Sequence, residues 1–221
     1  MRIMRATVAL IILAVLAWGG IELGRRLDGR WQAPGDWWGA HATESHYGEE
    51  VREWSAFYDL PFPYLMALIQ LESGGKKPAG KRFEKHVFEK LQELQEEQRM
   101  TFENLTPSHL DGASQEAIRN LATSWGPFQL MGYKCILLGV QIRDIRGQDA
   151  IRSGVDWINQ TYGDRLREGQ YRDAFHLHNT GKPYPKEGPP STYHPDYVER
   201  GLRFMEEYAE AESFRDSTDA L

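Results

Sequence analysis

The segment Tyr64–Leu71 (YLMALIQL) constrains the fold more than any other part of the sequence, because as a helix it is apolar on nearly every side. Such a helix has no face suited to water and has to be surrounded by other elements. The prolines just before it break any preceding helix, and Pro63 is well placed in its first turn. The sequence therefore predicts a domain built around one buried helix.

This helix ends in Glu72, which is followed by Ser73 and by two glycines, Gly74 and Gly75. A carboxylate in a last turn faces the negative end of the helix dipole, and apolar surroundings disfavour its charge, so both effects raise its pKa. The glycines let the chain turn away and leave room for another molecule. A carboxyl group that keeps its proton near neutral pH beside an opening has the property that a general acid requires. The alternative interpretation is a solvent-exposed glutamate at a helix end.

Helical patterns dominate the sequence on both sides of this segment. A helix starting at Ser45 or Gly48 would align four apolar side chains at the helical repeat, Val51, Trp54, Phe57 and Tyr58. Long runs of alternating apolar and polar residues are absent from the sequence. We therefore predict that residues 45–215 form one mostly α domain, with at most a short β-hairpin between Gly74 and Phe88.

The N-terminus differs in composition from the rest of the chain. The uncharged run Ala6–Ile21 lies between pairs of arginines, and as a helix it would span roughly 24 Å. We predict that residues 1–23 form a hydrophobic helix that acts as a signal-anchor or a cleavable signal peptide. Residues 24–44, rich in Gly and Trp, are predicted to be a tether, and residues 216–221 a tail.

Charge and cysteine content exclude several classes of function. The chain has 26 Lys and Arg against 32 Asp and Glu, a net charge of −6, and it lacks a basic block, so we expect no nucleic-acid partner. Its single cysteine, Cys135, excludes an internal disulfide framework and a Cys-rich zinc module. His176, His178 and His194 could be imagined as metal ligands, but no further ligand has a convincing spacing. We therefore predict neither a metal nor a cofactor.

Three motifs, in order, resemble those of the lysozyme-like superfamily, in the branch of soluble lytic transglycosylases and goose-type lysozymes. The run DLPFPYLMALIQLESGG resembles the helices that deliver a catalytic glutamate in a Glu-Ser motif, with Glu72 and Ser73 matching. SWGPFQLMG is similar to the Gly-x-x-Gln segment, with Gln129 matching. The stretch DAIRSGVDWINQTYGDRLREGQYRDAFHLHNTG resembles the penultimate helices and the Tyr-Asn-x-Gly turn, with Asn179 matching.

Other features of the sequence refine this resemblance. FEKHVF, residues 83–88, together with SWGPFQLMG, is similar to the N-acetylmuramidase domains of phage endolysins and related bacterial enzymes. The family's usual tyrosine before the asparagine is replaced here by His178. The segment after Gly181, KPYPKEGPPSTYHPDY, contains five prolines and is longer than the family's usual turn.

The resemblance implies a lysozyme-like domain that binds peptidoglycan and cleaves the β-1,4 bond between N-acetylmuramic acid and N-acetylglucosamine, with Glu72 as general acid and base. It implies that Gln129 and Asn179 hydrogen-bond the sugars. Further substrate-binding candidates are Ser73, Glu84 and the aromatic residues Trp125, Tyr133 and Tyr184, whose rings could stack on pyranose faces. Because this substrate lies outside the cytoplasm, we expect either a single-pass inner-membrane protein with a periplasmic catalytic domain or a protein exported to the periplasm or cell wall.

Two products and two other functions stay open at this point. Glycosidases that act by hydrolysis normally use two carboxyl groups. Glu84 and Glu89 are the nearest candidates for the second, but neither is convincing, whereas the transglycosylases that the sequence resembles work with one glutamate. FEKHVF favours the muramidase branch. The alternatives are a catalytically inactive, membrane-tethered murein-binding component of an envelope or secretion apparatus, and a tethered interaction protein without a sugar partner.

Overall fold

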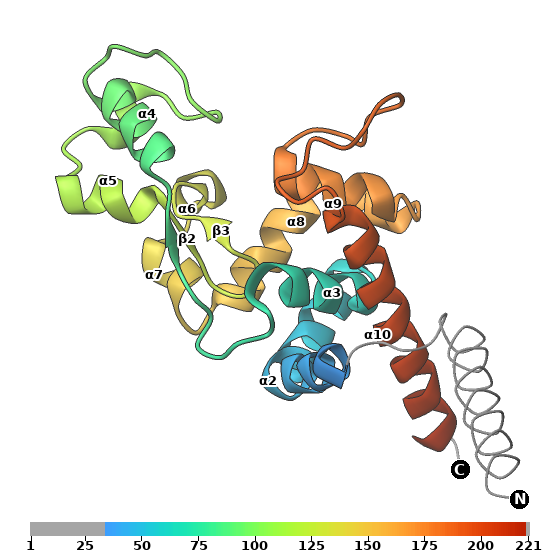
Figure 1. Ribbon diagram of the computed structural model, residues 1–221. Helices are drawn as coiled ribbons and strands as arrows, with labels where there is room; N and C mark the ends of the chain where they lie inside the picture. Colours follow the sequence, from blue (N-terminus) through green and yellow to red (C-terminus); the bar gives the residue numbers. More distant parts are fainter. Residues whose placement is uncertain (1–33, 220–221) are drawn as a thin grey trace, which may run out of the picture. The chain divides into compact units, whose positions relative to one another are not determined.

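The computed structural model describes residues 34–219, of which residues 39–219 belong to one compact unit. Figure 1 shows its mostly helical architecture, as predicted. The elements in chain order are α2 (Pro34–Tyr58), α3 (Phe62–Ser73), β1 (Arg82–Phe83), α4 (Lys85–Gln95), the 3-10 helix η1 (Pro107–Leu110), α5 (Gln115–Leu121), β2 (Thr123–Trp125), β3 (Leu130–Met131), α6 (Lys134–Leu138), α7 (Ile142–Arg146), α8 (Ala150–Arg167), α9 (Tyr171–Thr180) and α10 (Tyr197–Asp219). None of the described helices is both long enough and apolar enough to cross a membrane. The predicted N-terminal helix, residues 1–23, lies outside the described residues.

Helix α3 is the buried helix that the sequence predicts. Six consecutive side chains, from Tyr64 to Ile69, are completely buried. Proline occupies its first turn, where the missing N–H is not needed, and Gly74 ends it in the left-handed conformation, with φ 61°. Gly75, with φ 65°, lies so close to Thr43 of α2 that a Cβ at this position would be 1.7 Å from the threonine Oγ1. The double glycine therefore allows both the turn and the close packing of α2.

Helix α2 begins at Pro34, whereas the sequence predicted a tether up to residue 44 and a helix from Ser45 or Gly48. The early part of the helix is held by tertiary contacts, since buried Thr43 donates a hydrogen bond to the Gln70 side chain of α3. Helices gain most of their stability from such packing, which local patterns do not reveal. The predicted apolar stripe is also wrong in one position, because Phe57 is 71% exposed. At the other end of the chain, α10 extends to Asp219, so most of the predicted tail is helical.

No hairpin forms between Gly74 and Phe88, where the sequence predicted at most a short one. One strand, β1, does lie in this range, but it pairs with β2 in antiparallel register, Arg82 opposite Ser124. The hairpin is formed instead by β2 and β3, with Trp125 opposite Leu130. Strands of two or three residues are too short to show an alternating pattern, so sequence reasoning located only one of the three.

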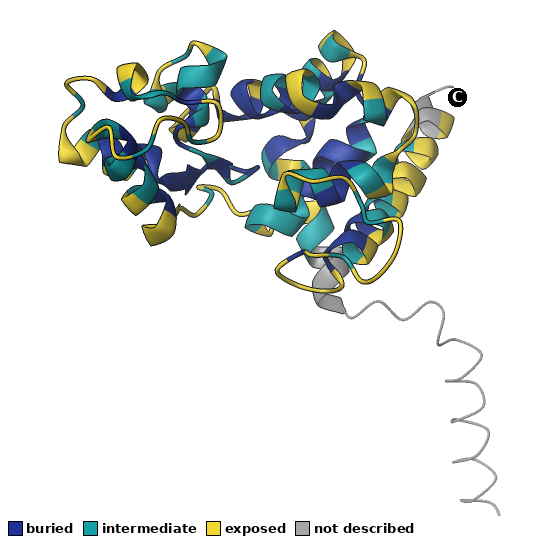
Figure 2. Ribbon diagram, turned by 90° about the horizontal axis from the view of Figure 1, so that it is seen from above, coloured by how far each residue is buried: buried dark blue, intermediate teal, exposed yellow. Residues whose placement is uncertain are grey.

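Two hydrophobic clusters divide the compact unit into two lobes. The large lobe consists of α2, α3, α8, α9 and α10, and the small lobe of the sheet with α4, η1, α5, α6 and α7. Buried segments, dark blue in Figure 2, are present in both lobes. Phe128, from the turn between β2 and β3, belongs to the cluster of the large lobe and packs against Gly154, where a Cβ would lie 2.2 Å from its ring. The packing of the Phe128 ring against Gly154 therefore connects the sheet turn to the helices that surround α3.

Candidate functional site

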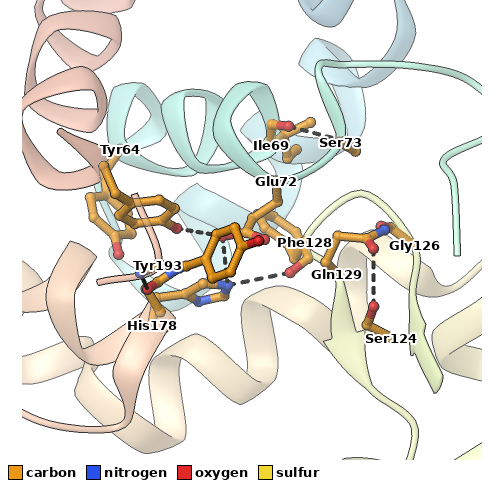
Figure 3. A network of polar contacts seen from close by, with 12 residues as sticks. Tyr64, Ile69, Glu72, Ser73, Ser124, Gly126, Phe128, Gln129, His178 and Tyr193 are labelled. Carbon is orange, nitrogen blue, oxygen red and sulfur yellow. Dashed lines mark hydrogen bonds and ion pairs between the residues drawn. The ribbon is translucent and has the colours of Figure 1, made fainter. Parts of the chain in front are cut away.

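Glu72 occupies the last turn of α3, and its side chain is 17% exposed. The Tyr197 hydroxyl, at the start of α10, donates a hydrogen bond to Glu72 Oε1. His178 Nε2 of α9 lies 3.9 Å from the same oxygen. Figure 3 shows the Glu72 side chain between His178 and Tyr64 on one side and Phe128 and Gln129 on the other. Four elements of the fold therefore converge on one carboxyl group.

Burial raises the pKa of Glu72 above its usual value. The hydrogen bond from Tyr197 and the positive charges of Arg82 and Lys134 oppose this shift without cancelling it. Arg82 belongs to β1 and Lys134 to α6, so Glu72 lies where the large lobe meets the small lobe. The raised pKa of Glu72 agrees in direction with the prediction from the sequence.

His178 is held in one uncharged form by its neighbours. Its Nε2 lies 3.3 Å from the Phe128 carbonyl oxygen, which only accepts, so Nε2 carries the hydrogen. Its Nδ1 then accepts a hydrogen bond from the Tyr162 hydroxyl at 2.8 Å. The Tyr64 hydroxyl in turn donates to the Tyr162 hydroxyl at 3.5 Å. Burial, reinforced by the charge of Lys134, lowers the pKa of His178 to about 3. The contact with Glu72 is therefore polar and is not an ion pair at neutral pH.

Lys134 is a cation whose charge acts on the pKa of both Glu72 and His178. Burial lowers its pKa to about 8, although the negative charges of Glu103 and Glu72 act in the opposite direction. Its ammonium group lies 4.5 Å from the centre of the Trp157 ring. An ammonium ion placed in this way favours the carboxylate form of Glu72 once the proton has left.

Two of the residues predicted from motifs, Ser73 and Gln129, have partners within the protein. Ser73 Oγ donates to the Ile69 carbonyl at 3.0 Å, a bond within α3. Gln129 has a left-handed backbone, φ 47°, and its side-chain NH₂ donates to the carbonyls of Gly80 and Gly126 at 2.9 Å each. Its Oε1 accepts from Ser124 Oγ at 3.1 Å, as Figure 3 shows. Gln129 thus ties the sheet turn to the loop before β1.

The predicted aromatic residues differ in exposure. Trp125 is buried, its indole N–H donates to the Asn120 carbonyl, and cationic groups of Lys81 and Arg146 lie over its ring. Tyr133 is also buried, edge-to-face with an aromatic neighbour. Tyr184 is half-buried, and its backbone N–H donates to a side chain of α9. The structure therefore uses the first two mainly as core residues of the small lobe.

Asn179 and the acidic candidates lie at the surface or are paired. Asn179, near the end of α9, is exposed, and its Oδ1 accepts from the Tyr193 backbone N–H at 3.3 Å. Glu84 precedes α4 and contacts Arg82 at 2.5 Å, while Glu89 pairs with a lysine one turn earlier. Neither glutamate is among the groups that shift the pKa of Glu72. The structure therefore does not bring a second carboxylate to Glu72 within the part of the chain that it describes.

The three histidines considered as metal ligands have separate partners. His176 bonds to backbone groups of the segment that follows α9, His178 to Tyr162, and His194 packs against the Tyr193 ring. Among the described side chains, no group of three or more His, Cys, Asp or Glu residues could hold a metal ion.

Two hollows in the described surface do not include Glu72. One, of about 450 Å³, follows the second half of α8 and the turn after it, from Asn159 to Gln170, and its lining is mostly polar. The other, of about 520 Å³, is mostly apolar and lies between α5 and the α6–α7 region, next to Cys135. Neither combines a carboxyl group of raised pKa with buried hydrogen-bond partners. Those two properties, and not hollow size, identify Glu72 as the candidate site.

Sequence reasoning missed the other members of the site. Tyr197 follows the proline-rich segment, and Tyr162 lies at a kink in α8, where its φ is −150°. Lys134 follows the SWGPFQLMG motif almost directly. Only His178 carried a signal, because it replaces the tyrosine that the resemblance leads one to expect.

This arrangement can donate a proton and take it back. A mostly buried carboxyl group with a raised pKa can protonate a leaving group, and Tyr197, Arg82 and Lys134 can stabilise the carboxylate that results.

Comparison with known proteins found no matching family model, no matching curated protein and no matching solved structure.

Proposed function

We propose that this chain cleaves peptidoglycan glycan strands at the β-1,4 bond between N-acetylmuramic acid and N-acetylglucosamine, with Glu72 as general acid and then general base. The observation that carries the proposal is the Glu72 carboxyl group, whose pKa burial raises while Tyr197 bonds to one of its oxygens. The three motifs that resemble lysozyme-like enzymes supply the substrate class and the proposed lysozyme-like fold. In this proposal the wall-facing domain is anchored or exported by residues 1–23.

The reaction begins when protonated Glu72 donates to the glycosidic oxygen as the bond to the anomeric carbon of N-acetylmuramic acid breaks. The new carboxylate is stabilised by the Tyr197 hydroxyl and by the charges of Arg82 and Lys134. It then removes a proton from the incoming nucleophile, which restores the acid for the next cycle. His178 stays uncharged and takes no proton near neutral pH, because its pKa is about 3.

The surroundings of Glu72 favour an intramolecular nucleophile. Both charged groups that act on its pKa are cationic. Hydrolytic glycosidases normally place a second carboxyl group about 5–9.5 Å from the acid. Attack by the 6-hydroxyl of N-acetylmuramic acid needs no second carboxylate and gives a 1,6-anhydro product, as in a lytic transglycosylase. Attack by water would make the enzyme a muramidase.

The test compares digestion of purified murein by the parent protein and by Glu72→Gln. General acid–base catalysis contributes roughly 10²–10⁴-fold, so the variant should lose at least about that factor in turnover while still sedimenting with murein. Glu89→Gln is the matched control, because Glu89 is exposed and paired with a lysine on its own helix. Undiminished cleavage by Glu72→Gln would refute the assignment of this residue.

Mass spectrometry of the digest distinguishes the products, because an anhydro end is one water lighter than a reducing end. Anhydro ends support the transglycosylase, and reducing ends support the muramidase. Binding of murein by a parent protein that does not cleave the glycan strand would instead support the inactive wall-binding component.

A further inference from the structure

The proline-rich segment between α9 and α10 is fastened at both ends by one buried residue. His176 is 1% exposed. Its Nδ1 lies 2.8 Å from the Lys182 carbonyl oxygen, and its Nε2 lies 3.2 Å from the Ser191 backbone nitrogen. The carbonyl requires a hydrogen on Nδ1, and the N–H of Ser191 requires a free lone pair on Nε2. One imidazole therefore closes this segment into a loop.

One further contact fastens the loop to α9, and another lies within the loop itself. The backbone N–H of Tyr184 donates to Asp173 Oδ1 at 2.6 Å. Buried Thr192 donates its hydroxyl to the His194 carbonyl at 2.7 Å. These hydrogen bonds restrict the conformations that the loop can adopt.

The residue that this loop presents is Tyr193, which is 82% exposed. Its backbone N–H is held by Asn179 Oδ1, and its ring packs edge-to-face on His194, with centroids 4.9 Å apart. Asn179 directly follows His178, whose ring lies 3.9 Å from Glu72. In the view of Figure 3 the Tyr193 ring is drawn in front of the Glu72 and His178 side chains. A largely exposed aromatic ring is thus attached, through Asn179, to the residue next to His178, which is itself a neighbour of the candidate acid.

We propose that Tyr193 is a sugar-stacking residue of the glycan-binding site, presented by a loop that residues 182–196 build on His176. Pyranose rings have an apolar face of C–H groups that packs on aromatic rings, while the phenol hydroxyl can bond to sugar hydroxyl or N-acetyl groups. An aromatic ring whose conformation is already restricted loses little conformational entropy on binding. More of the free energy gained by burying the ring against a sugar therefore contributes to affinity. The ligand class is a β-1,4-linked N-acetylhexosamine strand. This inference rests on the proposed function for the identity of the ligand.

The test measures binding in the full-length chain carrying Glu72→Gln, so that turnover does not consume the ligand. Tyr193→Ala and Tyr193→Trp are compared in sedimentation with insoluble murein and in titration with soluble N-acetylglucosamine oligomers, which lack stem peptides. Phe57→Ala is the matched control, because Phe57 is also a largely exposed aromatic residue, 71%, on α2. Tyr193→Ala should weaken binding of both ligands about 3- to 10-fold, Tyr193→Trp should retain it, and Phe57→Ala should leave it unchanged.

Each outcome decides the proposal. Equal binding by the parent and Tyr193→Ala overturns it, as does a failure of Tyr193→Trp to retain binding or an equal loss in Phe57→Ala. Loss confined to murein would assign Tyr193 to the stem peptides and overturn the sugar-stacking role. If the parent binds neither ligand, this inference and the proposed function both fall. If Glu72→Gln still cleaves murein but Tyr193→Ala binds weakly, only the role of Glu72 fails.

Discussion

Replacing Glu72 by glutamine should remove a loss of stability that the parent protein suffers as the pH rises. Burial raises the pKa of Glu72 in the folded protein, whereas a glutamate in the unfolded chain has a pKa of about 4.3. Below both pKa values the residue is protonated in the folded and the unfolded state, so its ionisation does not lower the folding stability. Above the unfolded value the unfolded chain releases its proton first, so stability falls with pH until the folded pKa is passed. Glutamine does not titrate and escapes this loss.

The size of the effect follows from the pKa itself. Each unit by which the folded pKa exceeds the unfolded one costs about 1.4 kcal/mol of folding stability above the folded pKa. This figure already contains the opposing contributions of Tyr197, Arg82 and Lys134, because they act on the same pKa. For a domain of 150–250 residues, each unit corresponds to roughly 3–6 °C in Tm. The Glu72 side chain is 17% exposed, so water screens it little.

The assay is thermal unfolding of the parent and Glu72→Gln, followed by tryptophan fluorescence at intervals between pH 4 and pH 9. The two Tm values should be similar at pH 4, and the variant should gain on the parent as the pH rises. Glu89→Gln, which changes an exposed carboxyl group, should follow the parent within about 0.5 kcal/mol. A constant Tm difference, or a variant that loses stability relative to the parent at pH 8, would refute the reasoning. It would show that the site does not disfavour the charge of Glu72 and would remove the physical basis for a general acid.

Two further perturbations test the site and its support. Tyr197→Phe removes a donor to the Glu72 carboxylate and so raises the pKa of Glu72 further. The alkaline limb of the pH profile of kcat/KM should therefore move to higher pH by about one unit. An unmoved limb would mean that the Tyr197 hydroxyl does not lower the pKa of Glu72. Gly75→Ala should cost about 2–4 kcal/mol in urea denaturation, because its φ is 65° and the new Cβ would collide with Thr43. Gly74→Ala has a similar φ of 61° but nothing within 4 Å, so it should cost about 1–2 kcal/mol, and equal losses would contradict the packing argument.

The sequence was most informative where structure is determined locally. The apolar run of α3, its proline start and its glycine end are all features of neighbouring residues, and the prediction of a buried helix with Glu72 in its last turn is confirmed. The mostly helical fold class follows from the same kind of pattern. Short strands and early helix turns depend on partners instead. The pairing of Arg82 with Ser124 and the packing of Thr43 on Gln70 join segments whose local sequence carries no sign of the contact.

Aromatic residues show the same limit for the candidate site. Trp125, Tyr133 and Tyr193 all carry large aromatic rings, yet the first two are buried and the third is 82% exposed. Their difference comes from the elements around them, because the small lobe closes over Trp125 and Tyr133 while the loop fastened by His176 holds Tyr193 in solvent. A motif can therefore nominate rings that could stack on a sugar, but exposure determines which of them are able to do so.

The proton affinity of Glu72 joins the local and the distant contributions in one quantity. The effect that raises its pKa comes from burial at the end of an apolar helix, and this part can be read from the sequence around residue 72. The effects that lower it come from Tyr197, 125 residues later in the chain, and from Arg82 and Lys134 of the other lobe. The sequence could therefore predict that the pKa of Glu72 is raised, but not how far the opposing effects of distant residues reduce that rise. That balance decides the chemistry, because a carboxyl group raised by burial alone would donate its proton reluctantly, and one dominated by its cationic neighbours would have no proton to donate at neutral pH.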